Sequence, residues 1–133
     1  MCIRDSCTYD INSKTDFLNE IQRVCAEAEQ AVRSGSQHLI ITDKNISKDR
    51  IALPMILATS AVHSYLVKNN LRTFTSLNVS SLECLDVHYF AVLIGVGATT
   101  VNASLIENLV SDCLLYTSPS PRDATLSRMP SSA

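Results

Sequence analysis

The chain has 133 residues, of which 46% are hydrophobic and 18% charged, and its formal net charge is −2. This balance predicts one modest globular domain rather than a disordered segment. The near-neutral charge and the few aromatic side chains argue against a nucleic-acid-binding domain. No apolar run reaches the length of a transmembrane helix, and the N-terminus lacks the apolar stretch of a signal peptide. We therefore expect neither a nucleic acid nor a membrane as partner.

The five cysteines are odd in number and irregularly spaced. This favours a reduced, intracellular protein over a disulfide framework.

The two ends of the chain are related to each other at the level of codons. Met1–Ser6 can be encoded by ATG TGT ATA AGA GAC AG, whose reverse complement, in another frame, begins the codons for Cys113–Ser118. We therefore interpret residues 1–6 and 113–133 as translated sequencing adapter, the latter as a disordered tail, and leave both out of fold reasoning. Composition alone favours the alternative, a natural Ser/Pro-rich tail. The natural part is then a fragment, residues 7–112.

The first predicted helix lies near residues 15–34. Ser13 is a candidate start signal and Gly35 a candidate stop. Its apolar residues recur at helical spacing and form one stripe: Phe17, Leu18, Ile21, Val24, Cys25, Ala28, Ala31 and Val32.

A strand and a second helix follow. The continuous apolar run of residues 38–43 predicts a strand buried on both faces. Residues 45–50 form a polar loop. Pro54 suits the first turn of a helix over residues 54–68, which is apolar on almost every side and is therefore expected to be well buried.

The third strand and helix carry weaker signals. Residues 71–79 are rich in β-branched and aromatic residues and predict a second strand. Ser80-Ser-Leu-Glu83 has capping-box spacing and predicts the start of a helix that ends at Gly95. Residues 99–102 predict a third strand, and a last helix begins at Ser104 and runs to about residue 110.

The resulting order alternates helix and strand along the whole natural part. This predicts an α/β fold with a short parallel sheet, whose strands are joined by right-handed crossovers. Three strands do not complete a barrel or a doubly wound sheet. The chain is therefore expected to be an incomplete barrel-like or layered domain that needs neighbours to cover its edges.

Two patterns resemble ligand sites but are better explained structurally. Gly95-Val-Gly97 follows a predicted helix and precedes a predicted strand. A phosphate-binding loop has the opposite order, strand before and helix after, so we interpret the glycines as a helix C-cap. Cys84 and His88 lie one helical turn apart, but zinc needs three or four ligands, and His38 and His63 lie on other elements. We predict no metal site.

Polar residues gather where the predicted strands end. Asp43 and Lys44 follow the first strand, and Asn78, Ser80 and Asn102 lie at the same end of theirs. Ligands bind at this edge in α/β folds. Because no reactive pairing accompanies these residues, we interpret them as caps and turn residues and predict no catalytic or cofactor-binding residue. Cys25 lies on the apolar stripe and is predicted to be a core residue.

Several blocks of the chain, in this order and spacing, resemble the central domain of glutamate synthase large subunits. The family usually has Ser-Asp-Arg at residues 42–44 and Asn-Pro-Tyr at residues 102–104, where this chain has Thr-Asp-Lys and Asn-Ala-Ser. The matching blocks are residues 20–35 (EIQRVCAEAEQAVRSG), 39–44 (LIITDK), 53–58 (LPMILA), 61–63 (AVH), 71–76 (LRTFTS) and 87–98 (VHYFAVLIGVGA).

The resemblance implies a parent enzyme that makes two glutamates from glutamine and 2-oxoglutarate with a reduced electron donor. It implies an amidotransferase domain that releases ammonia, and a barrel that carries FMN and an iron–sulfur cluster. It also implies a small NADPH-oxidising subunit or ferredoxin as partner, in the cytoplasm or a plastid. The central domain joins the other two and helps enclose the ammonia path. The nucleophilic cysteine and the cofactor contacts lie outside this fragment, and Cys2, Cys7, Cys25 and Cys84 do not match them.

Two other hypotheses remain at this point. The first is a fragment of a free-standing (β/α) barrel lyase or isomerase, with Asp43 and Lys44 at its catalytic rim. The second is a small interaction module that is complete as it stands.

Overall fold

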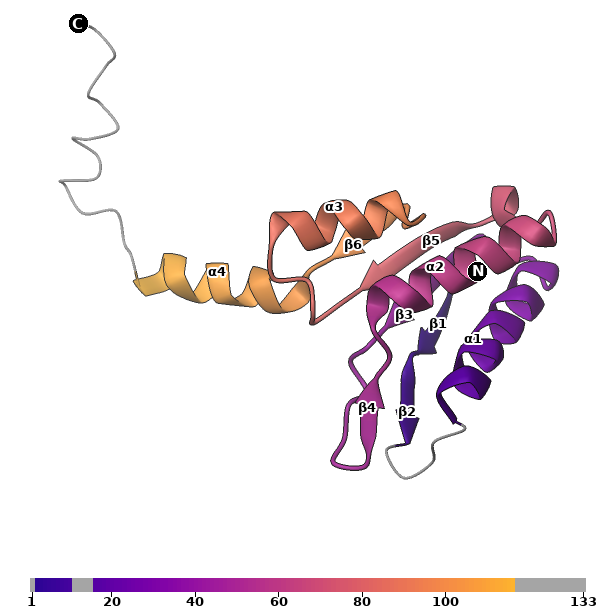
Figure 1. The fold of residues 1–133 in the computed structure, drawn as a ribbon. Helices are drawn as coiled ribbons and strands as arrows, with labels where there is room; N and C mark the ends of the chain where they lie inside the picture. Colours follow the sequence, from indigo (N-terminus) through magenta and orange to yellow (C-terminus); the bar gives the residue numbers. More distant parts are fainter. Residues whose placement is uncertain (1, 11–15, 117–133) are drawn as a thin grey trace, which may run out of the picture.

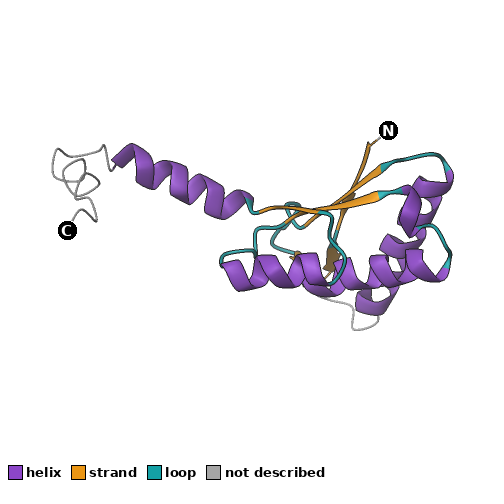
Figure 2. Ribbon diagram, turned by 90° about the horizontal axis from the view of Figure 1, so that it is seen from above, coloured by secondary structure: helices purple, strands orange, loops and turns teal. Residues whose placement is uncertain are grey.

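The computed structural model describes residues 2–10 and 16–116 (Figure 1). Its main sheet has four parallel strands side by side in chain order: β1 (Cys2–Ser6), β3 (His38–Thr42), β5 (Ser76–Ser80) and β6 (Thr100–Asn102). Right-handed crossovers between strands in this order place every connecting helix on the same face. Figure 2 shows this arrangement for α1 (Asp16–Arg33), α2 (Met55–Lys68) and α3 (Val87–Gly95). The predicted α/β class with a short parallel sheet is confirmed.

The first helix follows its apolar stripe closely. α1 ends where Gly35 adopts a φ of +96°, a conformation that glycine reaches without steric cost. The amide of Ser36 donates to the carbonyl of Ala31, and the amide of Gly35 donates to that of Val32. These two bonds form a Schellman cap, so the predicted stop at Gly35 is confirmed. The predicted start at Ser13 lies outside the described residues.

The core lies between the helices and one face of the sheet. Leu39 and Ile41 of β3 are buried, whereas Ile40 between them is only half-buried. The prediction that this strand is buried on both faces is therefore wrong, because all three helices cover the same side. The main core side chains from the helices and strands are Val24, Ala28, Ala31, Leu39, Ile41, Met55, Ala58, Val62, Leu66, Leu77, Val79 and Leu93.

The second helix is buried on one side only. Met55, Val62 and Leu66 are almost inaccessible, but Leu57 is 42% exposed and Val67 50% exposed. The expectation of burial all round is therefore not met. An apolar flank of α2 stays in contact with solvent in this chain.

Two of the predicted elements begin later than expected. Within residues 71–79, Arg72–Phe74 form a 3₁₀ turn, η1, before β5 starts at Ser76. The third helix starts at Val87 rather than near Ser80, and the carboxylate of Asp86 caps it by accepting from the amide of Tyr89 at 2.6 Å.

The structure continues into both end segments. β1 pairs in parallel with β3 along its whole length, and it adds a fourth strand to the three that the sequence predicted. The last helix, α4 (Ser104–Tyr116), begins at the predicted residue but runs past residue 110. Figure 1 shows it pointing away from the rest of the fold. The adapter origin of residues 1–6 and 113–133 stays a prediction.

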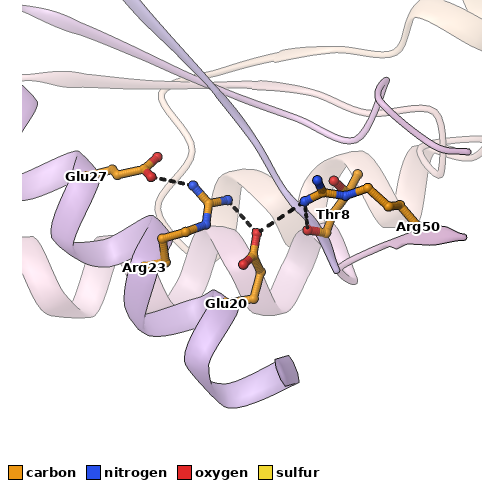
Figure 3. A network of polar contacts seen from close by, with 5 residues as sticks. All are labelled: Thr8, Glu20, Arg23, Glu27 and Arg50. Carbon is orange, nitrogen blue, oxygen red and sulfur yellow. Dashed lines mark hydrogen bonds and ion pairs between the residues drawn. The ribbon is translucent and has the colours of Figure 1, made fainter. Parts of the chain in front are cut away.

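A two-stranded ribbon extends from the carboxyl edge of the main sheet. β2 (Thr8–Asp10) pairs antiparallel with β4 (Arg50–Ala52). β4 begins at the last residue of the predicted polar loop, residues 45–50. Figure 3 shows the polar network that ties the ribbon to α1: Arg50 donates to the carbonyl of Thr8 at 3.1 Å and lies 4.0 Å from the Glu20 carboxylate. Glu20 also pairs with Arg23, and the hydrogen bond between them raises the pKa of the guanidinium.

A tyrosine–glutamate pair links α1 to α2. The Tyr65 hydroxyl donates to Glu29 at 2.7 Å, and Arg33 donates to the same carboxylate at 2.8 Å. Both hydrogen bonds lower the pKa of Glu29 below its ordinary value, and the bond from Tyr65 has the larger effect. A carboxylate with a lowered native pKa stabilises the fold above its unfolded-state pKa. That contribution is lost as the pH falls through the native pKa.

We predict that Tyr65→Phe raises the pKa of Glu29 towards its ordinary value, because it removes the largest cause of the shift. An NMR titration of the Glu29 carboxyl carbon measures this change. Tyr89→Phe is the matched control, since the Tyr89 hydroxyl donates to Glu83 instead. A Glu29 pKa that is the same in wild type and Tyr65→Phe would contradict the assignment.

Candidate functional site at the carboxyl edge of the sheet

The carboxyl ends of β3, β5 and β6 meet at a pocket of about 310 Å³ on the face of the sheet opposite the helices. The parallel register sets Thr42, Ser80 and Asn102 in one row across these strands. The prediction that polar residues meet at this edge is correct for four of the five residues. The lining is formed by Ile40, Lys44, Asn78, Val79, Ser80, Thr100 and Asn102.

Asp43 is the predicted edge residue that does not reach the pocket. It is fully buried, and both of its carboxylate oxygens accept from the amide of Leu82, at 3.0 and 2.9 Å. The hydroxyl of Ser81 also donates to it at 3.2 Å. Asp43 therefore anchors the loop between β5 and α3, as a turn-organising residue. The structure gives no support to a catalytic Asp43–Lys44 pair.

The capping-box pattern at residues 80–83 has a different use from the one predicted. The hydroxyl of Ser81 accepts from the amide of Glu83 at 3.1 Å and donates to Asp43, so it organises a turn instead of a helix start. The Glu83 carboxylate accepts from the amide of Met55 at 3.2 Å, at the beginning of α2. It therefore satisfies one helix N-terminal amide from another segment of the chain.

Cys84 and His88 do not share a helix face. Cys84 precedes α3 and is 1% exposed, whereas His88 lies in the first turn of α3 and is exposed. In the part of the chain that the structure describes, no cluster of three or more potential metal ligands occurs. His38 bonds to the hydroxyl of Ser76 at 2.6 Å, and His63 accepts from Arg72 at 3.1 Å, so these two histidines have separate partners.

α3 ends at Gly95 and Gly97, as predicted, and it is Gly97 that adopts a positive φ. Its φ is +119°, and its amide and that of Ala98 donate to the carbonyls of Ile94 and Leu93 in a second Schellman cap. Close packing accompanies this turn, because a Cβ at Gly97 would overlap the ring of His63.

Arg72 holds this turn against the sheet. Its guanidinium donates to Nδ1 of His63, to the carbonyls of Thr75 and Gly97, and to the hydroxyl of Thr99. The sequence did not point to this residue, which lay inside a predicted strand. No local pattern indicates its role, since its partners come from three other segments.

The buried cysteines have the environment of core residues. Burial raises the pKa of Cys25. Burial is also the main reason that the pKa of Cys84 is raised, and the negative charge of the nearby Asp86 raises it further. A raised pKa keeps a thiol protonated and weakly nucleophilic. The predicted core role of Cys25, which is 5% exposed, is confirmed.

A second pocket, of about 280 Å³, is almost entirely apolar and lies between α3 and the start of α4. Cys84, Val87, Phe90 and Ile106 contribute to its lining. Large apolar side chains in and around this pocket, on α3, on α4 and just before α3, are in contact with solvent. We call this surface the α3–α4 flank; its exposed members are Leu85, Val87, Phe90, Ile94, Leu105, Leu109 and Val110. Among the helices of residues 2–10 and 16–116, none is long and apolar enough to cross a membrane.

The sequence of the chain is similar to segments of several known proteins. The chain is 51% identical over 106 residues to the glutamate synthase [NADPH] large chain of Azospirillum brasilense, and the match covers 79% of this chain and 7% of that protein. It is 42% identical over 83 residues to the chloroplastic ferredoxin-dependent glutamate synthase of Spinacia oleracea, with 61% and 5% covered. It is 36% identical over 96 residues to the glutamate synthase [NADPH] large chain of Bacillus subtilis, with 72% and 6% covered.

The chain thus spans less than a tenth of the length of each of these relatives. Residues 3–126 match the family described as glutamate synthase central domain. This match covers most of the sequence, and together with the Azospirillum relative it places the chain in the glutamate synthase central domain family.

Proposed function

We propose that this chain is the structural, coupling part of a glutamate synthase. The parent enzyme makes two glutamates from glutamine and 2-oxoglutarate with a reduced electron donor, in ammonia assimilation. Its amidotransferase domain releases the ammonia, and its flavin barrel, with FMN and an iron–sulfur cluster, carries out the reductive step. The central domain holds these two domains in place and helps enclose the path between them.

The observation that carries this proposal is the α3–α4 flank. Val87, which is 86% exposed, lines the apolar pocket, and Leu109 and Val110 on α4 are 48% and 50% exposed. Exposed apolar side chains next to an apolar pocket are typical of protein interfaces. It supports contact with other domains of the same parent chain, which is many times longer than this one.

The polar residues support a role in scaffolding rather than catalysis. Within the described segments, the carboxylates of Asp43 and Glu83 hold backbone amides, and burial raises the pKa of the Cys25 and Cys84 thiols. The Ser76 hydroxyl, which bonds to the His38 ring, lines neither of the two pockets described above. We propose that the electron donor is a small NADPH-oxidising subunit or ferredoxin, and that the parent enzyme works in the cytoplasm or a plastid.

The proposal also concerns the ends of the chain. We propose that residues 1–6 and 113–133 come from adapter and that residues 7–112 come from the parent gene. The codon relation between the two end segments is what supports this division, although the family match at residues 3–126 extends into both of them. Flanking genomic DNA tests it: an open frame that replaces both end segments and encodes an amidotransferase upstream and a flavin barrel downstream is expected.

The purified 133-residue chain is expected to release no ammonia from glutamine and to form no glutamate from glutamine and 2-oxoglutarate. A coupled ammonia assay and a chromatographic glutamate assay, each with the Azospirillum enzyme as positive control, measure these activities. Either activity in the chain alone, above the level of a heat-denatured sample, would overturn the scaffold assignment.

A further inference from the structure

The pocket at the carboxyl ends of β3, β5 and β6 presents hydrogen-bond donors. Thr100 donates to Oδ1 of Asn78 at 2.6 Å, so the amide oxygen of Asn78 is occupied. The amide nitrogen makes one long bond, 3.4 Å, to the hydroxyl of Ser76, which leaves a second N–H available. Among the described residues, the side chains of Ser80 and Asn102 have no hydrogen-bond partner.

The charge of the lining points to an anion. Lys44 is the charged residue among those that line the pocket, and within residues 2–10 and 16–116 its ammonium has no ion-pair partner. Asp43, its neighbour, is turned into the β5–α3 loop and holds the amide of Leu82. Hard cations such as magnesium and calcium need several oxygen ligands with negative charge, which this lining lacks.

The size of the pocket and the one cation among its described lining residues limit the class of anion. About 310 Å³ is at the lower end of the range for small-molecule sites. One ammonium with two amide groups suits one negative charge shared by two oxygens. A phosphate dianion normally receives more than one cation or a helix N-terminus, and the residues described in the lining include neither.

We propose that this pocket binds the carboxylate group of a small organic acid. The Lys44 ammonium pairs with the carboxylate, and the side-chain amides of Asn78 and Asn102 donate to its oxygens. The site lies on the face of the sheet that the helices leave uncovered and reaches the carboxyl ends of the strands at Lys44, Ser80 and Asn102. The inference goes beyond the proposed function, which assigns no ligand to this chain.

The test uses acetate as the probe on the ¹⁵N-labelled 133-residue chain. Sodium acetate is expected to cause saturable shifts of the Lys44, Asn78 and Asn102 signals, at concentrations where sodium chloride of equal ionic strength causes none. Lys44→Met is expected to weaken binding about tenfold, the loss of one charge-assisted contact. Lys48→Met is the matched control, because Lys48 is exposed in the next loop and does not line the pocket.

A second variant and a second readout test the site independently of Lys44→Met and of the NMR shifts. Asn102→Asp adds a negative charge to the pocket that Lys44 lines, and it is expected to abolish acetate binding while the remaining signals keep their positions. Acetate is also expected to raise the urea midpoint of wild type and Lys48→Met, and not of Lys44→Met, because a ligand stabilises the state that binds it.

Three outcomes would overturn the proposal. Acetate shifts that do not saturate or that chloride reproduces would show that there is no site. Equal binding by Lys44→Met and Lys48→Met would remove Lys44 from it. Tighter binding of inorganic phosphate than of acetate would refute the carboxylate class.

Discussion

Gly97→Ala is expected to lower the free energy of unfolding by about 3 kcal/mol, from a strained backbone and a steric overlap together. The φ of +119° lies in a region that L-residues rarely adopt, and the added methyl group overlaps the His63 ring. Moving that ring breaks its bond with Arg72, which holds the same turn through the Gly97 carbonyl. Urea unfolding of the 133-residue chain, followed by circular dichroism, measures the change.

Gly95→Ala is the matched control for this variant. Gly95 lies two residues earlier, at the end of α3, and a Cβ there meets no atom within 4 Å. Alanine at this position is expected to be neutral or to stabilise the chain by up to about 0.8 kcal/mol, the difference in helix propensity. Equal urea midpoints for Gly97→Ala and Gly95→Ala would contradict the packing of this turn.

Asp43→Ala is expected to cost about 3 kcal/mol, because it leaves a buried amide and hydroxyl without their acceptor. Asp43 is fully buried, and its carboxylate is the acceptor for Leu82 and Ser81. The loss should free the loop between β5 and α3, so that the amide of Leu82 exchanges its hydrogen faster. Hydrogen exchange and urea unfolding together measure the effect.

Two further variants serve as controls for this prediction: Asp43→Asn at the same position and Asp49→Ala on the surface. Asparagine keeps one carbonyl oxygen and is expected to lose less stability than alanine. Asp49 is exposed in the loop before β4, and its replacement by alanine is expected to change stability by less than about 0.5 kcal/mol. A loss for Asp49→Ala as large as that for Asp43→Ala would argue against the anchoring role of Asp43.

Elements that depend on local pattern were predictable from the sequence. The apolar stripe of α1 and its Gly35 stop, the apolar run of β3 and the start of α4 each rest on neighbouring residues. Elements that depend on distant partners were not. The three-residue strands β2 and β4 exist only because Thr8 faces Ala52 across the chain, and nothing within either segment indicates that pairing.

The start of the third helix shows why a correct local rule can fail. The spacing of Ser80-Ser-Leu-Glu83 suits a capping box, but Ser81 bonds to Asp43 and Glu83 reaches α2. Tertiary partners thus outcompete the local cap, and the helix starts at Val87 instead, with Asp86 as its N-cap. The same competition turned Arg72–Phe74 from an expected strand into a 3₁₀ turn.

The candidate pocket was predictable in part. Parallel strands bring their carboxyl ends together, so the meeting of Asn78, Ser80 and Asn102 followed from the strand assignment. Ile40 and Thr100 were missed, although they pair with Asn78 on either side. The absence of Asp43 from the pocket lining was not predictable, because its side chain is turned towards the loop between β5 and α3 that it holds.

The central claim, that this chain supplies scaffold and not chemistry to a glutamate synthase, is tested most directly by a chimera. Residues 7–112 replace the matching segment of the Azospirillum brasilense large chain, which is 51% identical to this chain where they align. We predict that the chimera forms glutamate from glutamine and 2-oxoglutarate at a rate within about tenfold of the parent, since the proposed reacting groups lie in the unchanged domains. A chimera that folds and binds flavin like the parent but forms no glutamate would contradict the claim.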